Sequence, residues 1–313
     1  MFTGVFAGIT WALETVILGI ALAMSPFVSG SEAIALAPFV STFLHDGFSA
    51  VFMFVYNLVK GNLKELWRAL KSKECKWLCL ASAIGGPVGM TGYVLAVNYM
   101  GSSIGAVASA VYPAIGSFLA FVFLKEKVRW YQWIFLIFTL LGVYGISYSP
   151  DIDIKNFWFG ILGAFMCAFG WGTEGVILSK CLKNNVEPCC ALQIRQAVSA
   201  IVYAIIILPA LQGWNICVDL FEHQNIKTLM FIVLAAFCAT VSYSFYYRAI
   251  AKIGVSKAMA LNITYTAWAM VFSVVILKNY NLLNPLTVIC ALTVVVCSLL
   301  SAMDFRTFLN KKI

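Results

Sequence analysis

The sequence predicts an all-α membrane protein with ten transmembrane helices, arranged as two five-helix repeats of inverted topology. Three observations favour this fold class: an apolar composition, a one-sided distribution of basic residues, and a similarity between the two halves of the chain. Of the 313 residues, 62% are hydrophobic and 11% are charged. Soluble domains contain roughly 45–50% apolar and 25% charged residues, so this composition excludes a soluble globular protein.

Apolar windows of about 20 residues, each long enough to cross a bilayer core of roughly 30 Å, recur along the chain. Breaks at charged residues, Gly and Pro separate ten predicted spans, at 3–25, 33–59, 77–99, 102–124, 131–149, 156–179, 189–212, 228–248, 257–277 and 285–303. The first window contains Glu14 and runs into further spans, so we expect a transmembrane helix rather than a cleaved signal. Most of the ten cysteines fall inside apolar windows, which indicates no disulfide framework.

Lys and Arg residues fall on one side of these predicted spans. If the N-terminus is cytoplasmic, 17 of the 21 basic residues lie in cytoplasmic segments, at 60–76, 125–129, 180–183, 248–257 and 306–312. Acidic residues such as Asp151 and Asp153 then lie outside. Cytoplasmic loops of membrane proteins are enriched in Lys and Arg. We therefore expect a multi-pass protein of the cytoplasmic (inner) membrane with both termini in the cytoplasm. The net charge of +8 then reflects topology, and no nucleic-acid partner is expected.

The two halves of the chain, 1–152 and 153–313, carry matching residues in the same order. Trp11 and Glu14 in the first span correspond to Trp171 and Glu174 in the sixth. Further matches pair His45 with Arg195, Tyr93 with Tyr246, and Tyr112 with Tyr265. Because each half has an odd number of spans, the second copy enters the membrane from the opposite side. Inverted repeats of this kind bind their substrate near the midplane, where the halves meet.

Ionisable residues inside the predicted spans are the first candidates for function, because each costs roughly 2.5–3.5 kcal/mol at the bilayer centre. There are five, namely Glu14, His45, Asp46, Glu174 and Arg195. We expect the two glutamates to bind positive charge. Arg195 and Asp46 either form a structural ion pair between the halves or take part in gating or coupling. His45 titrates near neutral pH and is a candidate for proton coupling.

Aromatic residues recur at three-residue spacing beside these charges. In a helix this spacing places Trp11 with Glu14, and Trp171 with Glu174, on one face. Rings and carboxylates around one cavity suit an organic cation, because aromatic cages bind quaternary ammonium groups. Packing or an interfacial belt is the alternative for each aromatic residue alone. We expect the substrate-binding residues to be Trp11, Glu14, Tyr112, Trp171, Glu174, Tyr246, Asn262, Tyr265 and Trp268.

A pair of glycines and one proline occur within the third span. The spacing of Gly85 and Gly89 fits close helix packing. Pro87 lies between them and favours a local unwinding of the helix, which exposes backbone groups beside a cavity in some transporters.

The span-four segments Gly101 to Ser103 and Leu124 to Lys127 resemble the EamA-type permeases of the drug/metabolite transporter superfamily. A closer similarity is to bacterial choline permeases of the Lic type, carried by 45–46, 86–90, 96–103, 111–114, 167–174, 194–196 and 261–268. That resemblance implies a cage around a trimethylammonium group formed by Trp11, Trp171, Tyr246, Tyr265 and Trp268, with Tyr243 and Tyr247 as alternatives to Tyr246. Glu14 departs from the family pattern and points to an altered substrate.

These features predict a secondary transporter that imports choline or a related quaternary ammonium compound by alternating access, with symport as the expected coupling. The partners expected are the organic cation and the lipid bilayer. Two alternatives stay open: an exporter of amino acids, metabolites or drugs with the same fold, and a non-transporting membrane scaffold. Metalloprotease, nucleophile-elbow and P-loop motifs do not occur in the sequence, so we expect no enzymatic activity, cofactor or metal.

Overall fold

The structure is a computed structural model that describes residues 1–148 and 154–305. The acidic residues Asp151 and Asp153 and the basic segment 306–312 lie outside the described residues. Within the described ranges the chain is helical and contains no β-strand. The all-α class predicted from the sequence is therefore confirmed.

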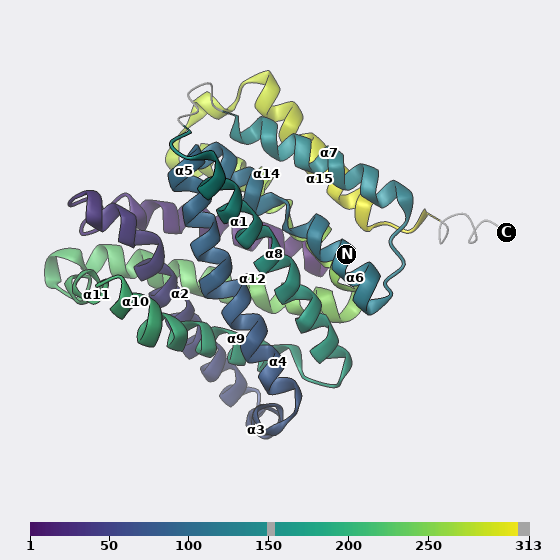
Figure 1. Cartoon of the computed structure of the whole chain (residues 1–313), viewed down its shortest axis with the longest axis horizontal. Coiled ribbons are helices and arrows are strands. Elements are labelled where there is room, and N and C mark those ends of the chain that lie inside the picture. The colour runs from purple at the N-terminus through teal and green to yellow at the C-terminus, as the bar shows by residue number, and fades with distance from the viewer. Residues whose placement is uncertain (149–153, 306–313) are drawn as a thin grey trace.

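The helices alternate with short connections along the whole described chain (Figure 1). The first half contains α1 (Phe2–Leu22), α2 (Ser31–Val59), α3 (Leu63–Lys71), α4 (Glu74–Ala83), the π-helical turn η1 (Ile84–Val88), α5 (Gly89–Ala110), α6 (Tyr112–Leu124) and α7 (Trp130–Ser147). The second half contains α8 (Phe157–Lys183), α9 (Pro188–Val202), the π-helical turn η2 (Tyr203–Ile207), α10 (Leu208–Ala210), α11 (Trp214–Asp219), η3 (His223–Asn225), α12 (Ile226–Ile253), α13 (Val255–Asn262), α14 (Tyr265–Leu277), η4 (Tyr280–Leu282) and α15 (Pro285–Ala302).

Nine helical stretches among the described residues are long and apolar enough to cross a membrane. The segment 102–124, predicted as one span, is divided between the end of α5 and the 13-residue helix α6. Pro113 lies in the first turn of α6. Its missing N–H and fixed φ favour the start of a helix over its continuation. α5 is itself bent at Gly101, whose φ of 84° is a conformation that glycine adopts at little cost.

The two halves of the chain pack against each other along most of their length. α1 packs along α12, α5 along α8 and α2 along α9, and α7 and α15 lie side by side at one edge of the bundle (Figure 1). Glycines permit the closest of these contacts, since a Cβ at Gly92 of α5 or Gly163 of α8 would lie 2.6 Å from backbone atoms of the facing helix. The interior of the bundle is therefore built from both halves.

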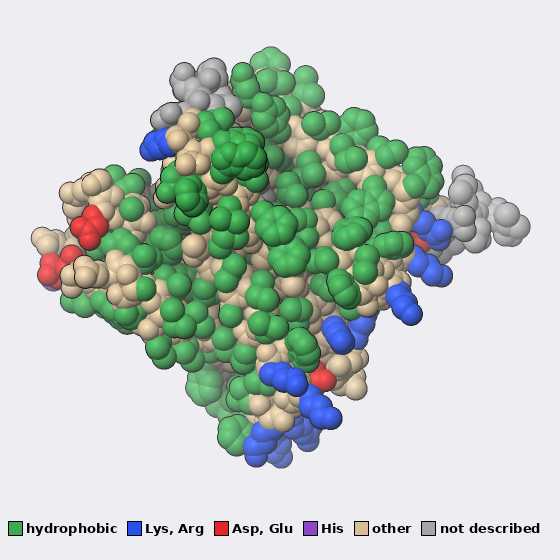
Figure 2. Space-filling model, viewed as in Figure 1, with side chains coloured by type: hydrophobic (Ala, Val, Ile, Leu, Met, Phe, Trp, Pro, Cys, Tyr) green, Lys and Arg blue, Asp and Glu red, His purple; other side chains and the backbone are tan. Residues whose placement is uncertain are grey.

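The surface has two polar ends separated by an apolar belt. Figure 2 shows Lys and Arg side chains gathered at the end of the bundle that carries α3 and the connection from α6 to α7, with acidic side chains at the opposite end. Large apolar side chains are exposed on the surface of the bundle, among them Phe123 (71%), Trp158 (78%) and Ile205 (70%). A bilayer covers such a belt without the cost of exposing it to water.

Candidate binding site at the centre of the bundle

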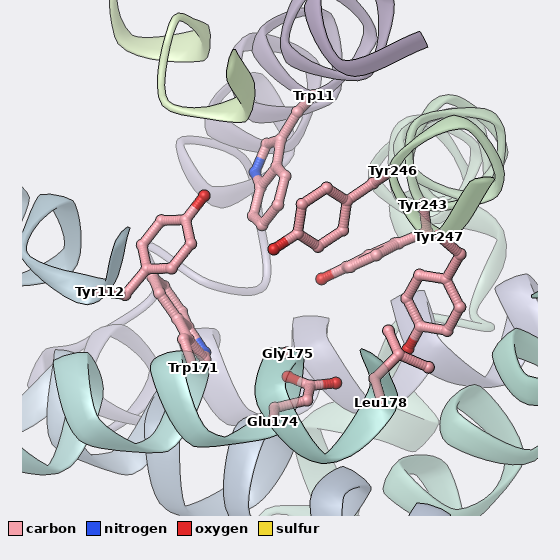
Figure 3. A pocket seen from close by; sticks show the side chains of 9 residues that line it. All are labelled: Trp11, Tyr112, Trp171, Glu174, Gly175, Leu178, Tyr243, Tyr246 and Tyr247. Atoms are coloured by element: carbon pink, nitrogen blue, oxygen red, sulfur yellow. The ribbon is translucent and has the colours of Figure 1, made fainter. Parts of the chain in front are cut away.

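Two cavities meet at the centre of the helix bundle. The larger, of about 360 Å³, extends along α1 from Trp11 to Leu22, and we call it the charged cavity because Glu14, His45, Asp46 and Arg195 line it. The smaller, of about 30 Å³, we call the aromatic pocket. It is lined by Trp11, Tyr112, Trp171, Glu174, Gly175, Leu178, Tyr243, Tyr246 and Tyr247 (Figure 3). Trp11, Trp171 and Tyr243 line both cavities and form the boundary between them.

Rings from four helices enclose the aromatic pocket. Trp11 of α1 stacks on Tyr265 and is tilted against Tyr243, with both centroid distances 5.4 Å. Trp171 of α8 lies edge-on to Tyr112 of α6 at 5.9 Å. In Figure 3, Tyr112 and Trp171 approach the centre from one side and the tyrosines of α12 from the other. A positive charge at this centre would face several rings at once.

The π-helical turn η1 positions Trp171 and Glu174. The indole Nε1 of Trp171 donates to the carbonyl oxygen of Gly85 at 2.9 Å. A Cβ at Gly85 would overlap the Glu174 side chain, and a Cβ at Gly89 would lie 2.8 Å from the Trp171 ring. The structure therefore matches both expectations for this segment: the glycines permit close approach, and the turn that contains Pro87 presents a backbone group to the site.

A buried network of charges connects the two halves beside the aromatic pocket. Arg195 donates from Nε to Glu174 at 2.8 Å and from Nη1 to Asp46 at 3.0 Å. His45 Nδ1 lies 2.9 Å from Asp46, and His45 Nε2 lies 3.6 Å from Glu14. The five side chains are at most 13% exposed. Buried charges are tolerated only when they are paired, so this network ties α1, α2, α8 and α9 together around the site.

The structure brings together most, but not all, of the residues predicted for the site. Those that line one or both cavities are Trp11, Glu14, His45, Asp46, Tyr112, Trp171, Glu174, Arg195, Tyr246 and Tyr265. Asn262 and Trp268 line neither of these two cavities, and their part in substrate binding stays a prediction. Asn262 ends α13, and its Nδ2 donates to the Tyr112 hydroxyl at 3.0 Å. Because the helix breaks between Asn262 and Tyr265, where α14 begins, the three-residue spacing does not keep these two residues on one face.

Some lining residues were missed or left open by the sequence analysis. Tyr243 and Tyr247, considered only as alternatives to Tyr246, line the aromatic pocket together with it. Ser41 and Thr42 of α2 line the charged cavity and were not predicted. The signal for Thr42 was available, because it lies one helical turn before Asp46 and therefore on the same face.

The sequence model of the EamA-like transporter family matches residues 1–148 and 158–303. The chain belongs to this family. It is therefore a multi-pass membrane transporter and not an enzyme. The chain is 26% identical over 294 residues to protein LicB of Haemophilus influenzae, with 92% of each chain covered. A solved structure titled "Crystal structure of protein" covers 95% of this chain and 96% of its own, with a TM-score of 0.70 and 15% identity. That likeness shows a shared fold.

Proposed function

We propose that the chain imports choline or a related quaternary ammonium compound across the cytoplasmic membrane. The observation that carries this proposal is the aromatic pocket, in which six rings and one carboxylate, that of Glu174, surround a single point (Figure 3). Each ring contributes roughly 0.5–2 kcal/mol toward holding a desolvated cation. A trimethylammonium group has no N–H to donate, so ring faces and a carboxylate are the groups that recognise it. The resemblance to Lic-type choline permeases supports the same substrate class.

The volumes of the two cavities support transport by alternating access. At about 30 Å³, the aromatic pocket has room for little more than water. At about 360 Å³, the charged cavity falls in the range of small-molecule sites, roughly 300–1,000 Å³. A substrate therefore enters through the charged cavity, and the rings at the boundary separate to admit its cationic group. The structure then represents the state in which the pocket is closed.

The proposal includes two inverted repeats, 1–152 and 153–313, with ten membrane crossings. The family model matches the chain in two stretches, one in each half. The backbone repeats its unusual conformations, with φ of 84° at Gly101 and 85° at Gly254, and 54° at both Lys125 and Lys278. The contacts between halves are reciprocal, because α1 packs on α12 and α14 while α8 packs on α5 and α6. A pseudo-two-fold axis through the site accounts for all three observations.

The charge distribution supports an orientation in the membrane, and the membrane potential supports inward transport. We assign the basic end of the molecule and both termini to the cytoplasm, because Lys and Arg concentrate in cytoplasmic loops (Figure 2). The charged cavity extends to Leu22 and Pro38, where α1 ends and α2 begins, at the other end of the bundle. It therefore faces the outside. A negative-inside potential drives a cation inward, with about 2.3 kcal/mol per charge per 100 mV.

Coupling and gating are assigned to His45, Asp46 and Arg195. The contact between Arg195 and Asp46 crosses between the halves, so any rocking of one half against the other must rearrange it. His45 bridges Glu14 and Asp46, and an imidazole ordinarily exchanges protons near neutral pH. This makes symport with protons the expected coupling.

Uptake of labelled choline into proteoliposomes with an imposed negative-inside potential tests the proposal. We expect uptake that exceeds empty vesicles, grows with the potential and is inhibited by unlabelled tetramethylammonium but not by zwitterionic amino acids. Uptake no greater than in empty vesicles would refute the proposal. Inhibition by amino acids alone would favour the exporter of amino acids as the function.

A further inference from the structure

Arg195 occupies the place where the two cavities meet. Its side chain lines the charged cavity, yet it donates to Glu174, the carboxylate of the aromatic pocket. Its guanidinium carbon lies 5.1 Å from the ring centroid of Tyr243, which lines both cavities. A carboxylate and an aromatic face are the two groups by which the proposed substrate would be recognised. The chain's own cation therefore holds these groups while the pocket is closed.

We propose that Arg195 is a tethered competitor for the cation site at Glu174 and thereby determines specificity. This inference rests on the proposed function and specifies which ligands can enter the aromatic pocket. A ligand with a permanent positive charge replaces the guanidinium on Glu174. A neutral ligand of the same shape leaves the ion pair intact, so the boundary between the cavities stays closed to it.

The contacts of Arg195 permit this exchange without leaving a buried charge unpaired. When Glu174 is taken by the substrate, the guanidinium keeps its Nη1 contacts with Asp46 at 3.0 Å and with Gln196 Oε1 at 2.6 Å. Removing one partner of a buried ion pair ordinarily costs about 3–5 kcal/mol, because it leaves an uncompensated charge. Here both Glu174 and Arg195 stay paired in the bound state, so exchange of partners avoids that cost.

The same arrangement disfavours ligands that carry a carboxylate. Glu14, Asp46 and Glu174 already place three carboxylates around one guanidinium and one imidazole. A zwitterion would bring a fourth carboxylate into this buried space, where like charges repel strongly. The substrate class is therefore a monovalent organic cation without an acidic group.

Binding measurements on the purified full chain test the inference, with the fluorescence of Trp11 and Trp171 as the readout. The ligands are choline and 3,3-dimethylbutan-1-ol, which has the same shape but carbon in place of the charged nitrogen. Arg195→Gln removes the competing cation. Arg248→Gln is the matched control, because Arg248 also lies over a ring, that of Phe245, and contacts Tyr56 but lines neither cavity.

We expect Arg195→Gln to bind choline about tenfold more tightly than the wild type, since the site is no longer occupied by its own cation, while Arg248→Gln binds as the wild type does. Weaker or unchanged choline binding in folded Arg195→Gln would overturn the inference while leaving the proposed function intact. Wild-type protein that binds choline no better than the uncharged alcohol would instead overturn the proposed function. If Arg195→Gln does not fold, Arg195→Lys decides, because its ammonium lacks the two separate donors, Nε and Nη1, through which Arg195 holds Glu174 and Asp46. Tighter choline binding by Arg195→Lys supports competition, and equal or weaker binding contradicts it.

Discussion

The charged cavity and the aromatic pocket share three residues but are built on different physical principles. The charged cavity is large and is lined by four ionisable side chains that pair with one another or with Glu174. The aromatic pocket is nearly filled by its own rings and contains one carboxylate. Ion pairs between helices have discrete partners, whereas ring faces hold a cation without fixing its orientation. Under the proposed function, the charged cavity selects for a cationic substrate and the aromatic pocket holds it.

The largest effect on choline uptake is expected from a substitution at Gly85. This residue lines the charged cavity, and its carbonyl oxygen accepts from Trp171 at the boundary between the cavities. In Gly85→Ala the new Cβ would overlap Glu174, which is held in place by Arg195, so we expect choline uptake to fall to the level of empty vesicles. Gly47→Ala is the matched control, since a Cβ on this glycine of α2 meets no atom within 4 Å. Uptake by Gly85→Ala that equals the control would show that the boundary tolerates displacement of Glu174.

Asp46→Asn disrupts an ion pair of the charged cavity and leaves the rings of the aromatic pocket unchanged. It removes the Nη1 partner of a buried arginine, and we expect the free energy of unfolding in detergent to fall by about 3–5 kcal/mol. The exposed pair of Glu65 and Arg68 on α3, 3.6 Å apart with side chains 38% and 77% exposed, gives the comparison. Glu65→Gln should change the free energy of unfolding by less than about 1 kcal/mol. Equal changes in the free energy of unfolding for the two substitutions would mean that the buried network stabilises the fold no more than an exposed ion pair does.

Trp171→Phe measures how much the aromatic pocket contributes to choline affinity. The smaller ring keeps an aromatic face but loses the indole and its contact with Gly85. We expect choline affinity, measured by isothermal titration calorimetry, to fall by about 2- to 30-fold, which corresponds to roughly 0.5–2 kcal/mol. Trp158→Phe on the same helix, at an exposed site, should leave the affinity unchanged. A loss in the Trp158 variant alone would place the cation outside the pocket.

The smallest effect is expected on the pH dependence of the uptake rate. His45 is buried between Glu14 and Asp46, and the other histidine of the chain, His223, lies exposed in η3. His45→Gln should abolish the change in uptake rate between about pH 6 and pH 8 while potential-driven exchange continues. His223→Gln should keep the wild-type profile. An unchanged profile in His45→Gln would assign this residue to structure instead of coupling.

Much of the site followed from helical periodicity, and the exceptions have physical causes. The three-residue spacing of Trp171 and Glu174 places both on the face of α8 that lines the pocket. The same rule is wrong for Asn262 because the chain leaves the helix between α13 and α14. Trp268 follows Tyr265 by three residues on the unbroken helix α14 yet lines neither cavity, so sharing a helical face with a lining residue is not sufficient to reach the site.

Side-chain contacts between helices were harder to predict from the sequence than the position of each residue along its own helix. The contact of Arg195 with Asp46 was expected as one of two alternatives, but the contact with Glu174 was not. Sequence periodicity gives the face of each helix and not the rotation of one helix against another. The rotation here depends on the glycines of η1 and α5, whose missing side chains let α8 approach.

A structure of the protein with choline bound tests the central claim most directly, because it shows the rings and the ion pair in one view. We expect the trimethylammonium group to lie among Trp11, Trp171 and Tyr243 beside Glu174, with the aromatic pocket enlarged well beyond its present 30 Å³ and the guanidinium of Arg195 released from Glu174 but still on Asp46 and Gln196. Choline bound away from these rings, with the pocket still closed and Arg195 still on Glu174, would contradict the account.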